Sequence, residues 1–190
     1  MTIGSDLHPT SGELWGADHG SDWKGDQIPP EELNQIQEGK NYGWPICYGK
    51  RIVDEATIAE PKDVTREEIA KKTYCARTEP AVLTYDAHAA PIGMVFYGGK
   101  QFPDTYQGDA FIAYHGSWNR TRPVGYKVVR TRFQNGKAIA WNDFLTGFID
   151  QAGKGYFGRP AGVVVARDGA LLISDDVNGV IYRVSHARSK

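Results

Sequence analysis

The polar segment from Asp18 to Asn34 holds the residues whose types and spacing point most directly to chemistry. It gathers several carboxylates and two glycines immediately after a short apolar stretch, Leu14–Ala17. Ca²⁺ in proteins takes six to eight oxygen ligands, from carboxylates and from backbone carbonyls that glycine-rich turns leave open. The segment therefore indicates a candidate calcium site. The alternative is an acidic loop that is simply solvated.

The elements that position this loop follow from a pattern that occurs three times. Each copy is a glycine, a short apolar strand, a turn and a second apolar strand, and the copies begin at Gly4, Gly93 and Gly162. Each copy ends in polar residues, at Asp18-His19-Gly20, His115-Gly116-Ser117 and Asp175-Asp176. Repeated strands that end in polar turns are typical of propeller blades, and further strands are expected at 126–133 and 180–184. The pattern predicts an all-β propeller; a β-sandwich is the alternative.

One stretch, residues 46–80, interrupts this repetition. It is polar and charged, and Thr65-Arg-Glu-Glu68 is a capping box that predicts a short helix ending at Lys72. A helical turn is also possible at Glu31–Ile36, after two prolines. We therefore expect one domain over 1–190, a partial propeller with an irregular, partly helical insertion at 46–80.

Cys47 and Cys75 flank the insertion. In an intracellular chain two cysteines are usually free thiols, whereas a bridge here would close a loop of about 28 residues and contribute about 3 kcal/mol. The sequence leaves both states open. A bridge would indicate an oxidising compartment.

The overall charge excludes two classes of partner. Lys and Arg number 22 against 23 Asp and Glu, for a net charge of -1, so no basic excess exists to neutralise nucleic-acid phosphates. The longest apolar run, near 162–166, is strand-sized, far below the roughly 20 residues of a membrane helix. We expect neither a nucleic-acid nor a membrane partner. The first residues, MTIGSDLHPTSG, also lack the basic and apolar regions of a signal peptide.

Several motifs, in order along the chain, resemble the soluble PQQ-dependent glucose/sorbosone dehydrogenases, and most closely the sorbosone branch. They are Gly12–Trp15, Asp18–Gly20, Glu32–Asn34, Asn41–Pro45, Ala90–Tyr97, His115–Arg120, Gly158–Gly162 and Asp168–Asp176. The resemblance implies a six-bladed propeller with PQQ and Ca²⁺ at one end of its channel. It also implies oxidation of an aldose or sorbosone-type sugar substrate by hydride transfer to the quinone.

The resemblance assigns site residues as well. The carbonyls of Gly20 and Ser21 match ligands of the Ca²⁺ shared with the quinone, Glu32 and the Tyr42 carbonyl match a second Ca²⁺, and Asp26 could belong to either. Arg159 matches an arginine that pairs with the quinone carboxylates, for which its planar guanidinium is suited. The segment that faces the cofactor contributes His115, Trp118, Asn119 and Arg120, although packing is the expected role of Trp118 and His115 could equally face solvent.

The length of the chain corresponds to about half of a six-bladed propeller. Without the insertion about 155 residues remain, or roughly three and a half blades at about 45 residues each. The family's histidine base matches nothing here, so no catalytic residue is assigned. The expected function is therefore that of the C-terminal half of a PQQ- and calcium-dependent sugar dehydrogenase, weakly active or inactive alone.

Two other functions stay open. One is a non-catalytic half-propeller that binds a partner or closes a ring as a homodimer, and the other is a lactonase-like propeller. The compartment depends on the same question: periplasmic if the chain derives from a full-length family member, and cytoplasmic if it is expressed as written.

Overall fold

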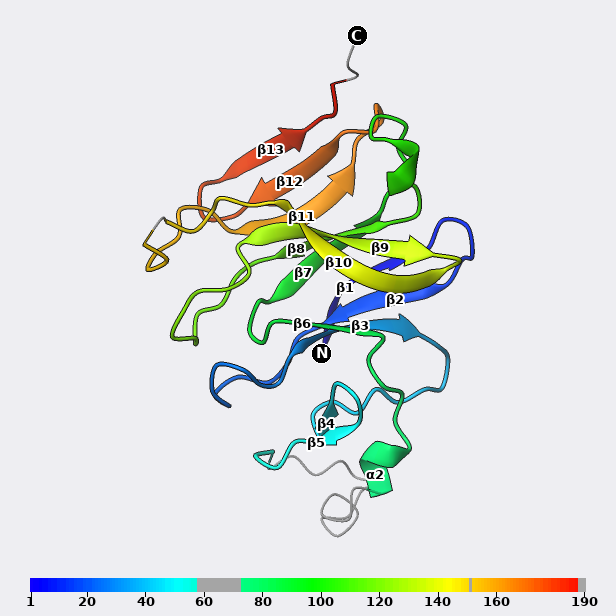
Figure 1. Ribbon diagram of the computed structural model, residues 1–190, viewed down its shortest axis with the longest axis vertical. Coiled ribbons are helices and arrows are strands. Elements are labelled where there is room, and N and C mark those ends of the chain that lie inside the picture. Colours follow the sequence, from blue (N-terminus) through cyan, green and yellow to red (C-terminus); the bar gives the residue numbers. More distant parts are fainter. Residues whose placement is uncertain (58–72, 151, 188–190) are drawn as a thin grey trace.

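Three antiparallel sheets follow one another along the protein in a computed structural model that describes residues 1–57, 73–150 and 152–187 (Figure 1). The first sheet contains β1 (Thr2–Leu7), β2 (Leu14–Asp18), β3 (Glu31–Ile36) and β6 (Leu83–Tyr85). The second contains β7 (Pro91–Phe96), β8 (Ala110–Tyr114), β9 (Lys127–Gln134) and β10 (Lys137–Leu145). The third contains β11 (Pro160–Val165), β12 (Leu171–Asp175) and β13 (Val180–Val184).

Each of these sheets is a meander, in which consecutive strands pair side by side. Helix is limited, among the described residues, to α2 (Thr73–Ala76) and the 3₁₀ turn η1 (Asp104–Tyr106). The prediction of an all-β fold is therefore confirmed. Within the described part of the chain the sheets form an open array and do not close into a ring (Figure 1). No helix there has the length and hydropathy to cross a membrane.

The repeated glycine of the sequence pattern lies where successive sheets approach each other. The first strands of the sheets pack together, β1 on β7 and β7 on β11. A Cβ at Gly4 would lie 3.3 Å from the Gly93 backbone, and a Cβ at Gly93 would lie 2.4 Å from the Ala161 oxygen. At Gly93 only a residue without a side chain allows backbones this close, and at Gly4 a side chain would be tight. The glycine thus sets the spacing of the sheets.

Strand β8 is the centre of the core because both of its faces are buried. Ile112 and Tyr114 point into the cluster between the first and second sheets, and Phe111 and Ala113 into the cluster between the second and third. Side chains alternate across a strand, so a continuous apolar run such as Ala110–Tyr114 fills two cores at once.

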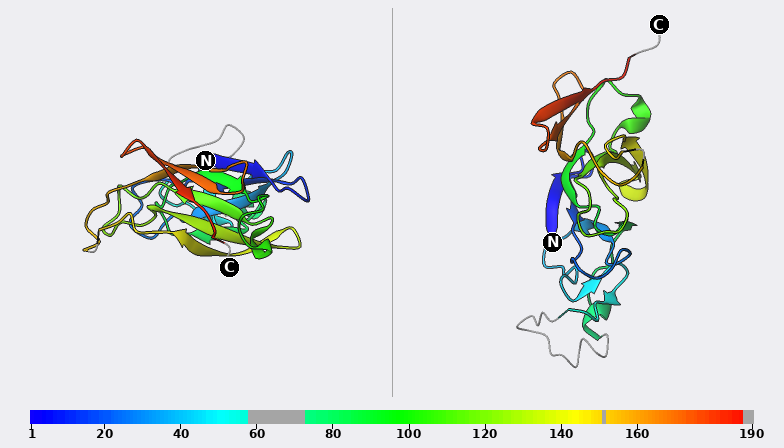
Figure 2. Two further views of the ribbon diagram at one scale, coloured as in Figure 1. Left: turned by 90° about the horizontal axis from the view of Figure 1, so that it is seen from above. Right: turned by 90° about the vertical axis from the view of Figure 1, so that its left-hand side faces the viewer.

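The described residues of the insertion at 46–80 lie at the end of the molecule opposite the third sheet (Figures 1 and 2). Its described part contains the two-stranded sheet of β4 (Cys47–Tyr48) and β5 (Ile52–Val53), together with α2. The Cys47–Cys75 disulfide, one of the two states left open by the sequence, is formed and lies in a small buried cluster with Ile46, Val53 and Tyr74. The predicted helix at 65–72 lies outside the described residues.

One possibility that the sequence left open is decided by the structure. Glu31–Ile36 is not a helical turn but strand β3, which pairs with β2 on one side and β6 on the other. Two neighbouring strands satisfy its backbone groups and bury Glu31, Leu33 and Asn34, and this tertiary pairing overrides the weak helix preference of its residues.

We predict that Gly93→Ala destabilises the protein by about 2 kcal/mol or more, because the new Cβ would push β7 away from β11. Gly98→Ala is the matched control, since Gly98 has open space around it, and its effect should stay within about 0.5 kcal/mol. Urea unfolding of both variants measures the difference. Equal effects would show that sheet spacing does not depend on Gly93.

Candidate functional site

A cationic groove of about 600 Å³ opens between two loops at the same edge of the sheets. One loop follows β8 and contributes residues between Ser117 and Tyr126; the other precedes β11 and contributes residues between Gly153 and Arg159. The lining includes three cations, Arg120, Lys154 and Arg159, three aromatic rings, Trp118, Tyr126 and Tyr156, and no carboxylate. The groove is therefore suited to a flat, anionic ligand.

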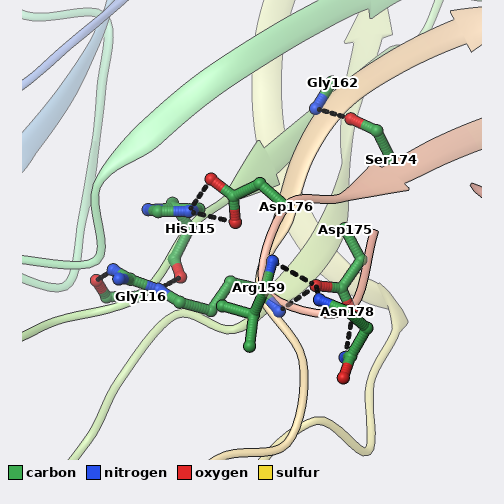
Figure 3. Close-up of polar contacts among 9 residues, drawn as sticks. His115, Gly116, Arg159, Gly162, Ser174, Asp175, Asp176 and Asn178 are labelled. Carbon is green, nitrogen blue, oxygen red and sulfur yellow. Dashed lines mark hydrogen bonds and ion pairs between the residues drawn. The ribbon is translucent and has the colours of Figure 1, made fainter. Parts of the chain in front are cut away.

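Arg159 is held in place by backbone oxygens of the opposite loop (Figure 3). Its Nε donates to the His115 carbonyl at 3.0 Å and its Nη2 to the Gly116 carbonyl at 2.9 Å. The guanidinium also lies 5.6 Å from the Tyr126 ring centroid and 5.4 Å from that of Tyr156. These contacts fix the orientation of the cation before any ligand binds.

Asp175, at the end of β12, anchors the backbone of Arg159. The buried carboxylate accepts from the Arg159 amide at 3.1 Å and from the side chain of Asn178 at 2.7 Å (Figure 3). It also accepts from the Tyr182 hydroxyl at 3.1 Å. Burial alone would raise the pKa of Asp175, but these hydrogen bonds outweigh it and lower the pKa below its ordinary value. Asp175 is therefore a charged structural anchor.

His115 and Asn119 contact other residues instead of lining the groove. His115 Nε2 donates to the Asp176 carboxylate at 2.9 Å, which ties the end of β8 to the turn after β12. Asn119 Nδ2 donates to Asp22 at 3.0 Å. Of the five residues predicted to bind the cofactor, three line the groove: Trp118, Arg120 and Arg159. The other two, His115 and Asn119, support its loops.

The sequence favoured packing of Trp118 in the interior, but the structure places it at the surface. It is 62% exposed and makes an edge-to-face contact with Trp23, which is 77% exposed, at a centroid distance of 4.8 Å. Two exposed indoles thus stand beside the groove and offer a flat apolar surface at its rim.

A second, much smaller cavity collects the predicted calcium ligands. The Asp18 cavity, of about 20 Å³, is lined by Gly20, Ser21, Glu32 and Tyr42 as well as by Asp18 itself. Burial raises the pKa of Glu32, although the Gly49 amide and Asn34 side chain donate to its carboxylate. The structure brings together residues that the resemblance had divided between two Ca²⁺ sites.

Asp26, the fifth predicted ligand, lies elsewhere. Its carboxylate accepts from the Thr121 amide at 3.0 Å, and this hydrogen bond lowers its pKa. Together with the Asp22–Asn119 contact, it joins the acidic loop to the loop that lines the cationic groove. His88 supports the same loop by donating to the Gly25 carbonyl at 2.8 Å.

Sequence reasoning missed two contributors. Lys154 lines the groove between Gly153 and Gly155, and a lysine flanked by glycines shortly before Arg159 was an available signal. Asp175 belonged to a quoted motif, but its role was not assigned. The Asp-x-x-Asn spacing to Asn178 is a turn pattern in which the aspartate side chain accepts backbone amides, as it does here from Val177 and Asn178.

We predict that Asp175→Asn costs about 2–3 kcal/mol of stability at neutral pH, because it removes a buried charge that accepts several hydrogen bonds. Since the folded-state pKa is lowered, the stabilisation is present above the ordinary value of 3.8 and is lost as the pH falls through the folded pKa. Urea unfolding from about pH 7 down to about pH 3 should therefore show a smaller acid loss in the variant than in the wild type.

Asp176→Asn is the control for this prediction, because that carboxylate is exposed and its pair with His115 should contribute less than about 1 kcal/mol. If the two variants behave alike, Asp175 is not an anchor.

Known proteins with similar sequences are mostly longer than this chain. An uncharacterised protein from Borreliella burgdorferi is 38% identical over 191 residues, which cover 98% of this chain and 47% of that protein. A pyrroloquinoline quinone-dependent pyranose dehydrogenase from Coprinopsis cinerea is 30% identical over 172 residues, which cover 74% of this chain and 22% of that protein. The chain thus spans about half the length, or less, of these curated relatives.

A similar fold occurs in a Trichoderma reesei carbohydrate-active enzyme of family AA12. Its iodide structure superposes with a TM-score of 0.74 at 25% identity, covering 98% of this chain and 52% of that one, and its calcium structure has a TM-score of 0.72. The family model described as TrAA12-like matches residues 2–187. With this match over nearly the whole length, the chain belongs to the TrAA12-like family.

Proposed function

We propose that this chain is part of a PQQ- and Ca²⁺-dependent sugar dehydrogenase and carries the surface that binds the quinone. The observation that supports this most is the cationic groove, where three cations and three aromatic rings converge without a carboxylate. PQQ is a flat tricarboxylate, so both its shape and its charge suit this lining. When bound, the quinone supplies the group that accepts hydride from the sugar.

Within the groove, Arg159 is the residue best placed to hold a carboxylate. Nε and Nη2 are engaged by backbone carbonyls, whereas Nη1 has no hydrogen-bond partner among the described residues. A guanidinium fixed on one side and open on the other binds an anion without a large loss of side-chain entropy. Lys154 and Arg120 add positive charge along the same lining.

The Asp18 cavity is the proposed calcium site of this chain. Asp18 Oδ1 is buried there without a hydrogen-bond partner, and nearby Asn34 Oδ1 is also without one. An unpaired buried carboxylate oxygen is costly, and a cation would compensate it. Since no group of three or more His, Cys, Asp or Glu side chains in the described ranges is arranged to hold a metal, backbone and amide oxygens would complete the ligand set.

The three sheets correspond, in this proposal, to about half of a six-bladed ring. The first strands of neighbouring sheets pack against each other at Gly4 and Gly93. The corresponding glycine of the third sheet, Gly162 on β11, is instead exposed, and 53% of the surface of nearby Val164 is exposed as well. A further sheet would fit against this face. The rest of the ring, including the histidine base that the resemblance implies, lies outside this sequence, and the chain alone should turn over sugar weakly or not at all.

The same uncovered face favours a second candidate function, a non-catalytic half-propeller that closes its ring as a homodimer. A second copy could cover Val164 and Ile181, which is 70% exposed. Sedimentation or light scattering tests this, because a solution mass of 21.0 kDa rather than twice that value would exclude it.

We predict that PQQ binds the chain in the presence of Ca²⁺ and that Arg159→Ala weakens this binding about 10- to 100-fold, the effect expected from losing a charge-assisted hydrogen bond. Quenching of tryptophan fluorescence during a PQQ titration measures it, since Trp118 lines the groove. Arg167→Ala, at an exposed turn at the other end of the sheets, should bind like the wild type.

Dye reduction with an aldose, on the PQQ-loaded protein, then separates the candidates. Turnover would establish a dehydrogenase, PQQ binding without turnover would fit the half-site, and no PQQ binding at any concentration would overturn the proposal in favour of the non-catalytic module.

For calcium, we predict that Ca²⁺ raises the melting temperature of the wild type by several degrees and that Asp18→Asn abolishes the rise. EDTA should reverse the effect. Asp143→Asn, at an exposed carboxylate paired with Lys127, is the control and should keep the full shift. A wild-type melting temperature that does not respond to Ca²⁺ would exclude the Asp18 cavity as a calcium site.

A further inference from the structure

A second groove, of about 490 Å³, lies at the opposite end of the sheets from the cationic groove. Three turns form it: the β1–β2 turn with His8 and Thr10, the β7–β8 connection with Gln107 and Gly108, and the β9–β10 hairpin with Phe133 and Asn135. Gly108 precedes β8 and Ser117 follows it, so the length of this strand separates the two grooves. We call this second groove the His8 groove.

His8 supplies a fixed hydrogen-bond donor to this groove. The side chain is only 6% exposed, and its Nδ1 accepts from the Ser11 amide at 3.2 Å and the Thr10 amide at 3.4 Å. A neutral imidazole that accepts at Nδ1 must carry its proton on Nε2. That Nε2–H has no partner among the described residues, although the residue lines the groove. The nitrogen itself is accessible from the groove, so this donor is free to bind a ligand or a water molecule there.

The surroundings hold the imidazole in place and leave room beside it. The ring packs edge-on against Phe96 at 5.0 Å and also contacts Phe133 at 5.5 Å. Gly108 faces Nε2, and a Cβ there would lie 3.4 Å from it. Because Gly108 has a φ of +75°, a side chain is disfavoured at this position, and the space next to the donor stays open.

Amide groups from the other two turns complete the set. Gln107 uses its Nε2 to donate to the Gly99 carbonyl, which leaves its own carbonyl oxygen available. Asn135 adopts a φ of 52° in the Asn135-Gly136 turn, and its side-chain amide makes no hydrogen bond within the described residues. The groove therefore presents donors, acceptors and the Phe133 ring together.

The charge of the lining distinguishes this groove from the cationic one. The lining contains no Lys, Arg, Asp or Glu, and the carboxylate of Glu13 lies close to Gly136, so an anionic ligand would find no cation to compensate its desolvation. A saccharide carries hydroxyl groups that both donate and accept, and apolar C–H faces that pack on an aromatic ring. We propose that the His8 groove is a binding site for a neutral saccharide, independent of the quinone and of the proposed oxidation.

An NMR titration of the isotope-labelled chain with maltohexaose and with cellohexaose tests this. We expect saturable shifts at the amides of Gly108 and Gly136 and at the imidazole nitrogens of His8, with a dissociation constant on the order of 1 mM for so open a groove. Gln107→Ala and Asn135→Gly should each weaken binding about three- to tenfold, the effect of one neutral hydrogen bond. Asn135→Gly keeps the positive φ of the turn.

Asn142→Ala, at an exposed amide on β10 that does not line the groove, is the control and should bind like the wild type. Arg159→Ala should also leave these shifts unchanged, so that failure of PQQ binding and failure of the saccharide site are separate results. Shifts confined to 117–126, or wild-type affinity in both the Gln107→Ala and the Asn135→Gly variants, would overturn the proposal. Equal binding of an oligogalacturonate would overturn its restriction to neutral saccharides.

Discussion

The close approach of backbones between the first strands of successive sheets is the constraint on which the other features depend. At Gly93 the β7 backbone lies so near the carbonyl of Ala161 on β11 that no side chain fits between them, and Gly4 makes a less extreme but still tight approach of β1 to β7. This spacing lets the side chains of β8 reach both neighbouring cores. It also brings the loops of the second and third sheets close enough for Arg159 to reach the carbonyls of His115 and Gly116.

Positively and negatively charged side chains gather in different parts of the molecule, although the net charge of the chain is only -1. Cations converge in the groove between the 117–126 and 153–159 loops, whereas Asp18 and Glu32 line a small cavity between the first sheet and residues 42–54. The acidic loop joins these regions through the contacts of Asp22 with Asn119 and of Asp26 with Thr121. An ion bound in the Asp18 cavity would therefore stabilise a loop that also supports the cationic groove, a physical route by which metal and cofactor binding could be coupled.

The all-β fold and most of its strands could be predicted because they rest on local signals. Glycine at turns and alternating or continuous apolar runs identified eight of the eleven strands in the three sheets, and the polar ends where the candidate sites lie. Strand β10 escaped notice because it is a mostly exposed edge strand whose sequence, KAIAWNDFL, mixes polar and apolar residues without a clean alternation. Strand β3 was open to a helical interpretation since only its neighbours, β2 and β6, reveal the pairing that its backbone makes.

For the candidate site, the sequence by itself determined which residue types were available: a guanidinium between Gly158 and Pro160, a carboxylate-rich loop and an aromatic after His115. The tertiary structure decided which of them meet. It placed Trp118, Arg120 and Arg159 in one groove with Lys154, and directed His115 to Asp176 and Asn119 to Asp22. The reason is physical: turn and strand preferences act over a few residues, whereas these contacts join loops separated by 40 residues or more. Their proximity is set by how closely the sheets pack.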